Sequence, residues 1–516
     1  MGRFLIRGLV LAGALAGCAV AAEPARLYAE HCASCHGADR FGGIGPALLP
    51  SNLERLRKPA AAEVIANGRL ATQMPGFADK LTPAEIAALV ELVYARVEPA
   101  PRWGEAEIRA SRVVHHAAGS LPDKPQYAAD PFNLFLVVET GDHHVSVLDG
   151  DRLEPIHRFA SRYALHGGPK FTPDGRYVFF ASRDGWISKF DLWNLATVAE
   201  VRAGLNTRNA AVSSDGRFVA VANYLPHTLA ILDADLNLVK LLEVKDKAGR
   251  RSSRVSAVYD AGPRRSFVAA LKDVKEIWEV SYDPKAPEIP AGVIHDFQYR
   301  EGAFIPGFLN PRRTELDDYL DDFFFTPDYN EVVGASRDAP QGQVVHLDVR
   351  RKIATLDLPG MPHLGSGITW LRDGRRVMAT PNLREGLVSV FDIKAWQPVA
   401  QIATLGPGFF MRSHEASRYA WVDSMMSPAH KDTLQVIDKQ TLAVVARLRP
   451  EPGKTLAHVE FTRDGRYALA SLWEMDGAII VFDAQTLKEV KRIPMKKPVG
   501  KYNVHNKVTK SEGTSH

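Results

Sequence analysis

Two cysteines and a histidine near the start of the chain form the motif with the most specific chemistry. Cys32 and Cys35 are separated by two residues, and His36 follows at once. This spacing is typical of covalent haem attachment, in which each thiol forms a thioether to a vinyl group and the histidine supplies one axial nitrogen to the iron. A structural zinc site would need a second cysteine pair, which the sequence lacks. The motif therefore predicts a c-type haem.

A methionine further along the chain is placed to supply the second axial ligand. Met74 lies 38 residues after His36 (74 − 36) and begins a Met-Pro-Gly-Phe sequence at 74–77. Small cytochromes c use such a loop to bring a thioether sulfur to the face opposite the histidine. Ligation by methionine and histidine raises the reduction potential of the iron. We therefore expect His36 and Met74 to be the axial ligands of the covalent haem.

The residues around this motif have the pattern of a small all-α cytochrome c domain, over 23–98. A first helix is predicted over 25–35, with the two cysteines at its end. Thr82, a following proline and Glu85 form a capping box that begins a second helix. Apolar residues then recur at helical spacing, at Ile86, Leu89, Val90 and Val93.

Residues 1–22 have the features of an export signal. A basic start is followed by a short apolar run over 8–17, too short to span a membrane. Two cleavage positions compete: a Leu-Ala-Gly-Cys sequence resembles a bacterial lipoprotein box with Cys18 lipidated, whereas 19–22 resembles an ordinary cleavage site. We expect a periplasmic protein without disulfides, bound to a membrane only if Cys18 is lipidated.

Length and charge bound the remaining organisation. The chain has 516 residues, 46% of them hydrophobic, and a net charge of +4 at pH 7. That length suits a small domain followed by one large repeat domain. No lysine- or arginine-rich run stands out, so nucleic acid is not an expected partner. A proline-bearing segment with weak periodicity predicts a linker over 99–131.

From about residue 132 the sequence changes to short β-strands that repeat. Each strong copy begins with an Asp-Gly-Arg turn and ends in an apolar strand that closes on aspartate, at 174–192, 215–233, 373–392 and 464–483. Weaker copies lie at 134–149, 266–282, 325–348 and 417–438. The first two strong copies begin 41 residues apart (215 − 174), a blade-sized period. Because one blade cannot bury both faces alone, eight copies predict an all-β eight-bladed propeller over 132–516, with a central funnel.

The repeat also predicts which residues line the funnel. In a propeller the innermost strand runs into the Asp-Gly-Arg turn, so residues at the start of that strand lie at one mouth. Counting back from four turns places a histidine or arginine at this mouth each time, at His166, Arg208, His363 and His458. His414 falls beside a turn at the opposite end and is not expected there. A cluster of three histidines in a haem protein makes this mouth the candidate site.

A cytochrome c domain followed by an eight-bladed propeller resembles the cytochrome cd1 family. The strings that carry the likeness lie at 163–166, 183–185, 190–193, 223–226, 361–367 and 500–506. The resemblance covers nearly all of the chain after the signal and is specific in combination. It implies a propeller that holds haem d1, or its precursor, without a covalent bond and exchanges electrons with haem c.

The resemblance also implies roles for residues at the mouth. His166 and His363 both lie in strings similar to the family, so either is a candidate iron ligand. Haem d1 carries several carboxylates, and arginine binds a carboxylate through two parallel hydrogen bonds. Arg183 and Arg208 are therefore the expected carboxylate ligands. Tyr502 lies after the last blade, where the closing segment is expected to fold back over the funnel.

Two enzymatic activities and one binding role fit the resemblance. The favoured activity removes two electrons and two protons from dihydro-haem d1, turning a propionate side chain into an acrylate. His458 and Tyr502 would then transfer protons, with His363 as a further catalytic residue. The alternatives are reduction of nitrite to nitric oxide, for which His414 is a misplaced distal donor, and a non-enzymatic haem d1 carrier. Expected partners are the haem d1 precursor, a periplasmic electron acceptor, and nitrite reductase or another haem d1 assembly protein.

Overall fold

The computed structural model describes residues 16–42, 45–53, 56–69, 74–98, 102–290, 304–335 and 341–514. The chain divides into two compact units, Met1–Pro101 and Arg102–His516. The predicted export signal lies outside the described residues up to residue 15, and the side chain of Cys18 is not described. Within the described ranges, no helix is both long and apolar enough to cross a membrane.

The first unit is helical, as predicted. Its helices are α1 (Ala16–His31), α2 (Ala33–His36), α3 (Pro50–Leu53), α4 (Lys58–Asn67) and α5 (Pro83–Tyr94). Helix α5 begins with the expected capping box, in which Glu85 N–H donates to Thr82 Oγ1 (3.3 Å) and Thr82 N–H donates to Glu85 Oε2 (2.8 Å). The predicted helix over 25–35 is two helices, because the backbone changes conformation at Cys32. One apolar cluster joins α1 to α5.

The second unit is an eight-bladed β-propeller of antiparallel four-stranded sheets, which confirms the predicted fold class. Three strands, β2 (Leu134–Glu139), β3 (His144–Asp149) and β4 (Glu154–Ala160), belong to the eighth blade, which the C-terminal strand completes. Four complete blades follow them along the chain. Their strands are β5 (Lys170–Phe171), β6 (Tyr177–Ala181), β7 (Trp186–Asp191) and β8 (Ala196–Arg202); β9 (Asn206–Val212), β10 (Phe218–Leu225), β11 (Thr228–Asp233) and β12 (Leu238–Glu243); β13 (Val255–Ala261), β14 (Ser266–Leu271), β15 (Glu276–Ser281) and β18 (Pro311–Glu315); β19 (Asp322–Phe325), β20 (Glu331–Ala335), β21 (Gly342–His346) and β22 (Arg351–Leu356).

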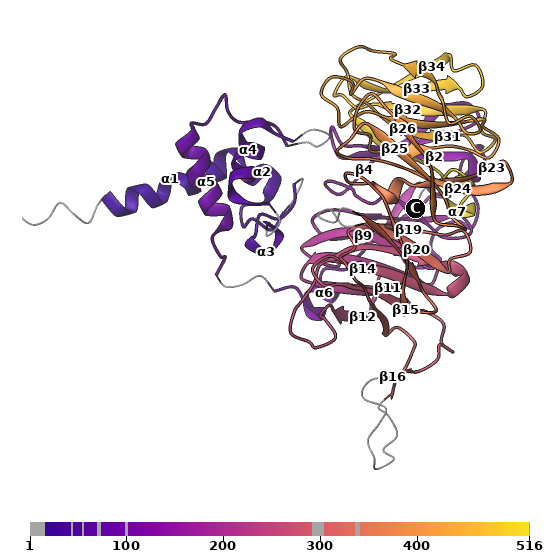
Figure 1. Ribbon diagram of the computed structural model, residues 1–516. Helices are drawn as coiled ribbons and strands as arrows, with labels where there is room; N and C mark the ends of the chain where they lie inside the picture. Colours follow the sequence, from indigo (N-terminus) through magenta and orange to yellow (C-terminus); the bar gives the residue numbers. More distant parts are fainter. Residues whose placement is uncertain are drawn as a thin grey trace, which may run out of the picture. The chain divides into compact units, whose positions relative to one another are not determined.

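Three further blades follow, and the colours of Figure 1 trace them to the yellow end of the chain. Their strands are β23 (Ile368–Arg372), β24 (Arg375–Pro381), β25 (Leu387–Asp392) and β26 (Gln397–Ala403); β27 (Met411–Arg412), β28 (Tyr419–Asp423), β29 (Leu434–Asp438) and β30 (Val444–Leu448); β31 (Leu456–Phe461), β32 (Tyr467–Leu472), β33 (Gly477–Asp483) and β34 (Glu489–Met495). A two-stranded hairpin, β16 (Ile289–Pro290) and β17 (Phe304–Ile305), is inserted between β15 and β18.

The eighth blade joins the two ends of the propeller. The C-terminal strand β35 (Pro498–Asn503) pairs antiparallel with β2, with Leu136 opposite Tyr502 and Val137 opposite Lys501. In Figure 1, β2 accordingly lies beside the yellow strands of the last blade. Such closure removes the open sheet edges that a ring would otherwise expose. It also places Lys501 and Tyr502 on an inner strand.

The first strand of each blade lies at the centre of the ring. Strands β9 and β31 are almost wholly buried, whereas the fourth strands, such as β4 and β34, alternate between exposed and half-buried residues. Neighbouring first strands also contact one another, as β9 does with β13. The residues at the start of these strands therefore face one mouth of the funnel.

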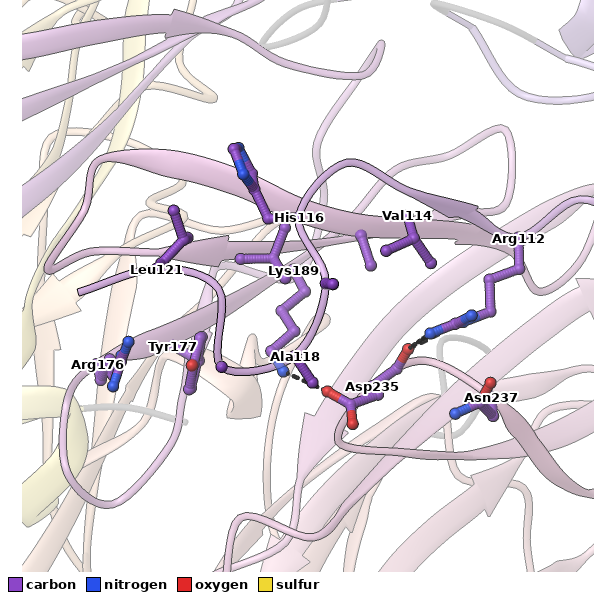
Figure 2. Close-up of a pocket in the computed structure, with 14 residues that line it drawn as sticks. Arg112, Val114, His116, Ala118, Leu121, Arg176, Tyr177, Lys189, Asp235 and Asn237 are labelled. Carbon is purple, nitrogen blue, oxygen red and sulfur yellow. Dashed lines mark hydrogen bonds and ion pairs between the residues drawn. The ribbon is translucent and has the colours of Figure 1, made fainter. Parts of the chain in front are cut away.

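The segment predicted as a linker over 99–131 is largely part of the propeller. From residue 102 it packs on the second unit, where α6 (Glu105–Ala110) buries Ile108 completely between two blades and β1 (Val113–Val114) adds a fifth strand to β8. Figure 2 shows a cavity beneath this segment, in which Lys189 Nζ lies 2.9 Å from a carboxylate oxygen of Asp235. Lys189 pairs with the carboxylate of Asp235, and Arg112 Nε donates to the backbone carbonyl oxygen of Asp235 (3.0 Å), so both side chains already have partners.

The C-terminal segment closes the other mouth of the funnel. Helix α7 (Val504–Thr509) and residues 510–514, together called the C-terminal plug, cross from blade to blade at the ends of the first strands. The contacts are Asn506 Nδ2 to Glu460 Oε1 (3.1 Å), Lys510 Nζ to Asp260 Oδ2 (3.5 Å), Ser413 N–H to Gly513 O (3.0 Å) and Arg376 Nη1 to Glu512 Oε2 (3.0 Å). The C-terminal plug therefore closes the mouth opposite the histidines.

Candidate functional site

The geometry around the C-x-x-C-H motif fits a covalent haem. Cys32 and Cys35 are half-buried thiols without a disulfide. His36 Nδ1 lies 2.7 Å from Pro46 O, and a carbonyl only accepts, so Nδ1 carries the proton and Nε2 keeps its lone pair for a metal. Burial lowers the pKa of His36, which keeps the ring neutral. A Cβ at Gly45 would lie 2.6 Å from the ring, so only glycine allows this packing.

Met74 lies in the same part of the first unit. It is half-buried against the apolar cluster that contains Cys32, Leu27 and Phe77. Arg69 N–H donates to the Met74 carbonyl (3.1 Å), which ties the methionine to the residues after α4. Cys32 and Met74 thus pack on one core, and Cys35 and His36 follow Cys32 within four residues of the chain. Their roles as haem ligands remain predictions that this geometry supports.

At the mouth of the propeller, His166 and Arg208 hold each other. His166 Nδ1–H donates to Arg208 O (2.7 Å), and Arg208 Nη1 lies 2.7 Å from His166 Nε2. Burial, with Arg183 and Arg208 nearby, keeps the pKa of His166 well below its usual value, so the ring is neutral. The structure therefore brings together three of the predicted site residues, with Nε2 of His166 already engaged by a guanidinium.

His363 presents a different arrangement. It precedes a short 3-10 helix, η3 (Leu364–Ser366), and its Nδ1–H donates to Phe409 O (2.6 Å). The ring packs on Phe409 at a centroid distance of 4.2 Å. Burial lowers the pKa of His363, although Asp322 opposes the shift. With Nδ1 occupied, Nε2 keeps a lone pair, so the predicted ligand His363 is ready to bind iron in the form observed.

His458 and Tyr502 lie against each other. Their rings are 5.2 Å apart in an edge-on contact, and Phe410 packs on His458 at 4.6 Å. His458 is 1% exposed and has a positive φ of 48°, a conformation that clusters at functional sites. Its Nε2 has no hydrogen-bond partner among the residues that the structure describes. Burial raises the pKa of Tyr502 to about 12, so the phenol is protonated at neutral pH.

Several cations of the funnel do not appear in the sequence prediction. Arg412 and Lys507 act electrostatically on His458, and Lys170 lies on β5. Burial lowers the pKa of Lys170 to about 8, with Lys510 and Arg412 adding to the shift. Together with Arg183, these groups suit a ligand with several carboxylates. Counting back from the turn at Asp174 could have found Lys170, which lies four residues before it (174 − 170). No such count points to a lysine in the C-terminal plug.

An aspartate and a tyrosine at the mouth were also missed. Tyr259 donates its hydroxyl to Asp322 Oδ1 (2.9 Å), and Gly365 N–H donates to Asp322 Oδ2 (2.8 Å). Asp322 therefore anchors the η3 loop that follows His363. No local pattern marks Asp322 as a site residue, since it begins β19 in one of the weaker repeats.

His414 lies at the end of the blade that the repeat predicted. Its Nδ1 accepts from Ala416 N–H (3.1 Å), and a Cβ at Gly465 would lie 2.3 Å from this nitrogen. His414 therefore packs beneath the Asp464-Gly465 turn. This turn lies at the end of β31, whereas His458 lies near its start. The histidine is not part of the group at the open mouth.

Asp423 makes the stability of the propeller depend on pH. It is 1% exposed, and burial raises its pKa to about 6, against backbone N–H donors at Phe409 and His458. Protonation therefore stabilises the folded state fully below pH 3.8, and this contribution is lost as the pH rises through about 6. We compare the free energy of unfolding of Asp423→Asn with that of the wild type by urea denaturation. From pH 4 to pH 7.5 this difference should shift in favour of the variant by roughly 1–3 kcal/mol. A difference that does not change with pH would contradict this assignment.

Comparison with known proteins agrees with both units. The model of the cytochrome D1 heme domain matches residues 129–507, and that of subunit III of cbb3-type cytochrome c oxidase matches residues 19–93. A dihydro-heme d1 dehydrogenase of Pseudomonas aeruginosa is 56% identical over 513 residues, 99% of each chain. A nitrite reductase of Stutzerimonas stutzeri is 23% identical over 570 residues, 98% of each chain.

A solved structure shares the same architecture. It is described as dihydro-heme d1 dehydrogenase NirN in complex with DHE, and it matches with a TM-score of 0.80 and 55% sequence identity. The match covers 94% of this chain and 100% of the solved one. The cytochrome c domain and the propeller thus occur together in the relatives, as the sequence predicts. The chain belongs to the family of proteins with a cytochrome d1 haem domain.

Proposed function

We propose that this protein is a periplasmic dihydro-haem d1 dehydrogenase, which converts a propionate side chain of the haem d1 precursor into an acrylate. The relative with 56% identity over 99% of both chains carries this name. The observation that carries the proposal is the contact of His458 with Tyr502 inside a cation-lined funnel. Loss of a proton from the side chain needs a positioned base, which His458 can supply, and a carrier needs none.

The cations of the funnel suit this substrate. A tetrapyrrole with several carboxylates needs cationic donors when it leaves water, and arginine offers two parallel ones. Arg183 and Arg208 stand at the mouth, and Lys170, Arg412 and Lys507 lie deeper. The funnel is floored by the C-terminal plug, so a flat macrocycle enters from the histidine mouth.

The two candidate iron ligands differ in readiness. His363 already has Nδ1 bonded to Phe409 O, which leaves Nε2 for the iron. His166 becomes a ligand only when Arg208 releases its Nε2. A carboxylate of the substrate would draw Arg208 away, so binding of that carboxylate and ligation by His166 are expected to occur together.

The reaction removes two protons and two electrons from adjacent carbons of the side chain. Among the described residues, His458 Nε2 has no hydrogen-bond partner, so it is the group placed to take the first proton, and the second proton leaves to water. Tyr502, with its pKa raised to about 12 by burial, holds its proton at neutral pH and orients the side chain by hydrogen bonding. Haem c, when bound, accepts the electrons one at a time. A periplasmic acceptor then takes these electrons, and nitrite reductase or an assembly protein receives the finished haem d1.

The test uses purified protein with its haem c oxidised. Dihydro-haem d1 is added without oxygen, and visible spectra are recorded over time. We expect reduction of haem c together with formation of haem d1, confirmed by a mass loss of two hydrogens. A stable complex without these changes would contradict the proposal. Turnover of nitrite by the haem d1 complex would then favour nitrite reductase, and its absence would favour a carrier.

A further inference from the structure

A buried lysine next to His458 is not used by the chemistry proposed above. Lys501 lies on β35 and is completely buried. Its Nζ donates to the carbonyl oxygen of His458 and lies 3.4 Å from His458 Nδ1. An isolated ammonium in such a place is costly, so lysines are rarely buried without a strong reason. The amine of Lys501 contacts both the backbone carbonyl and the ring of His458, which suggests that Lys501 acts on this histidine.

The groups around Lys501 are only partly satisfied. Glu460 on β31, Arg412 on β27 and Asp423 on β28 act electrostatically on the lysine. Arg412 Nε lies 4.0 Å from Glu460 Oε2, and neither atom has a hydrogen-bond partner within the described chain. Nε2 of His458 also lacks a partner there. Buried networks with a structural role usually satisfy their polar atoms. In this network, the acceptor Nε2 of His458 remains available for a ligand.

The protonation states follow from the same contacts. Burial lowers the pKa of Lys501 well below its usual value, although Glu460 opposes the shift. A neutral amine has two N–H bonds and one lone pair. An amine that donates to the His458 carbonyl can also accept from Nδ1–H, and in that tautomer Nε2 is unprotonated. Burial lowers the pKa of His458, and Arg412 on β27 and Lys507 on α7 add to this shift.

We propose that Lys501 is a positioning residue for His458. Its amine accepts a hydrogen bond from Nδ1–H of His458, so that Nε2 is unprotonated and can act as a base. When Nε2 takes a proton, the Nδ1 proton moves to the amine of Lys501. This inference rests on the proposed dehydrogenase function. A C–H bond of the substrate side chain breaks and an Nε2–H bond forms, while the Nδ1 proton moves to the amine of Lys501. The two electrons left on the substrate would pass one at a time through haem c to the periplasmic acceptor, and the proton of the second C–H bond would leave to water. The resulting ammonium lies near the carboxylates of Glu460 and Asp423, which stabilise it.

Two substitutions separate this role from a structural one. Lys501→Met removes the amine with little change of volume, and Lys501→Arg keeps a cation but cannot become neutral. In the holoenzyme with dihydro-haem d1, we expect kcat to fall at least about 30-fold in both variants, with KM within about threefold of wild type. Lys491→Met, the same change on the outer strand β34, is the control and should keep wild-type kcat.

A spectroscopic measurement tests the pairing without turnover. In the reduced holoprotein with 15N-labelled histidine, His458 of the wild type should be a neutral ring protonated on Nδ1. In Lys501→Met the proton should move to Nε2. Wild-type kcat in either Lys501 variant, or an Nε2-protonated ring in the wild type, would overturn the inference. If the variants fail to fold, the wild-type spectrum alone decides. If the wild type does not oxidise dihydro-haem d1, the proposed function fails, and the tautomer still tests Lys501.

Discussion

The His458→Ala variant will bind dihydro-haem d1 but oxidise it at least about 100-fold more slowly than the wild type, because a positioned general base contributes roughly 10²–10⁴-fold. The structure gives His458 the features of such a base. Its Nε2 has no hydrogen-bond partner in the described part of the chain, and its ring packs against Phe410 and Tyr502. Burial lowers its pKa, and the neighbouring Arg412 and Lys507 add to this shift. The ring therefore remains unprotonated through the neutral pH range, and the rate should not depend on pH there.

The measurement is the rate at which haem c becomes reduced after anaerobic mixing with saturating substrate. Tyr502→Phe should give a smaller loss than His458→Ala, because the phenol orients the side chain and is not the base. His157→Ala, on the outer strand β4, is the matched control and should behave as wild type. The change in the substrate spectrum on binding must persist in each variant. If both His458→Ala and Tyr502→Phe oxidised the substrate at the wild-type rate, the assignment of His458 as base and Tyr502 as orienting residue would be wrong.

The propeller could be predicted from the sequence because each blade carries its own local signal. In the Asp174-Gly175 turn, Thr172 Oγ1 donates to Asp174 Oδ1 (2.5 Å) and Arg176 N–H donates to the same oxygen (3.1 Å). Gly175 has a φ of +69°, which glycine adopts without strain. The same bonds recur around Asp464. Since these interactions lie within a few residues, the repeat shows them directly.

The site was predictable only where it follows that repeat. His166, Arg208, His363 and His458 all lie about six to ten residues before an Asp-Gly-Arg turn, and the structure places them near the starts of inner strands. Long-range contacts carry no such signal. Lys501 and Lys507 reach the funnel because β35 closes the ring and the C-terminal plug crosses its floor. Their position depends on closure of the whole propeller.

The segment predicted as a linker is a second case in which long-range packing left no pattern in the sequence. Residues 102–131 have weak periodicity, so the sequence gives little reason to pack them. Ile108 is nevertheless completely buried between two blades, and Trp103 Nε1 donates to Arg202 O (2.8 Å). The surface that receives these side chains exists only after the blades have formed. Single apolar residues that fill such gaps leave no pattern along the chain.

The second large effect is expected in the first unit. A Cys32→Ala/Cys35→Ala variant will carry no covalent haem, because both thioether bonds need these thiols. Denaturing electrophoresis with haem staining will show the loss. Oxidation of dihydro-haem d1 will then stop unless a soluble one-electron oxidant is added. Binding of the substrate will persist, because the propeller is a separate compact unit with its own core.

Ser34→Ala is the control for this experiment. Ser34 lies between the two cysteines and is exposed, so its hydroxyl should not be needed for haem attachment or activity. Substrate oxidation at the wild-type rate without covalent haem or added oxidant would show that the electrons take another route. Loss of substrate binding in the double variant would show that the two units depend on each other. The expected pattern, binding without oxidation, follows only if the propeller holds the substrate and the first unit accepts its electrons.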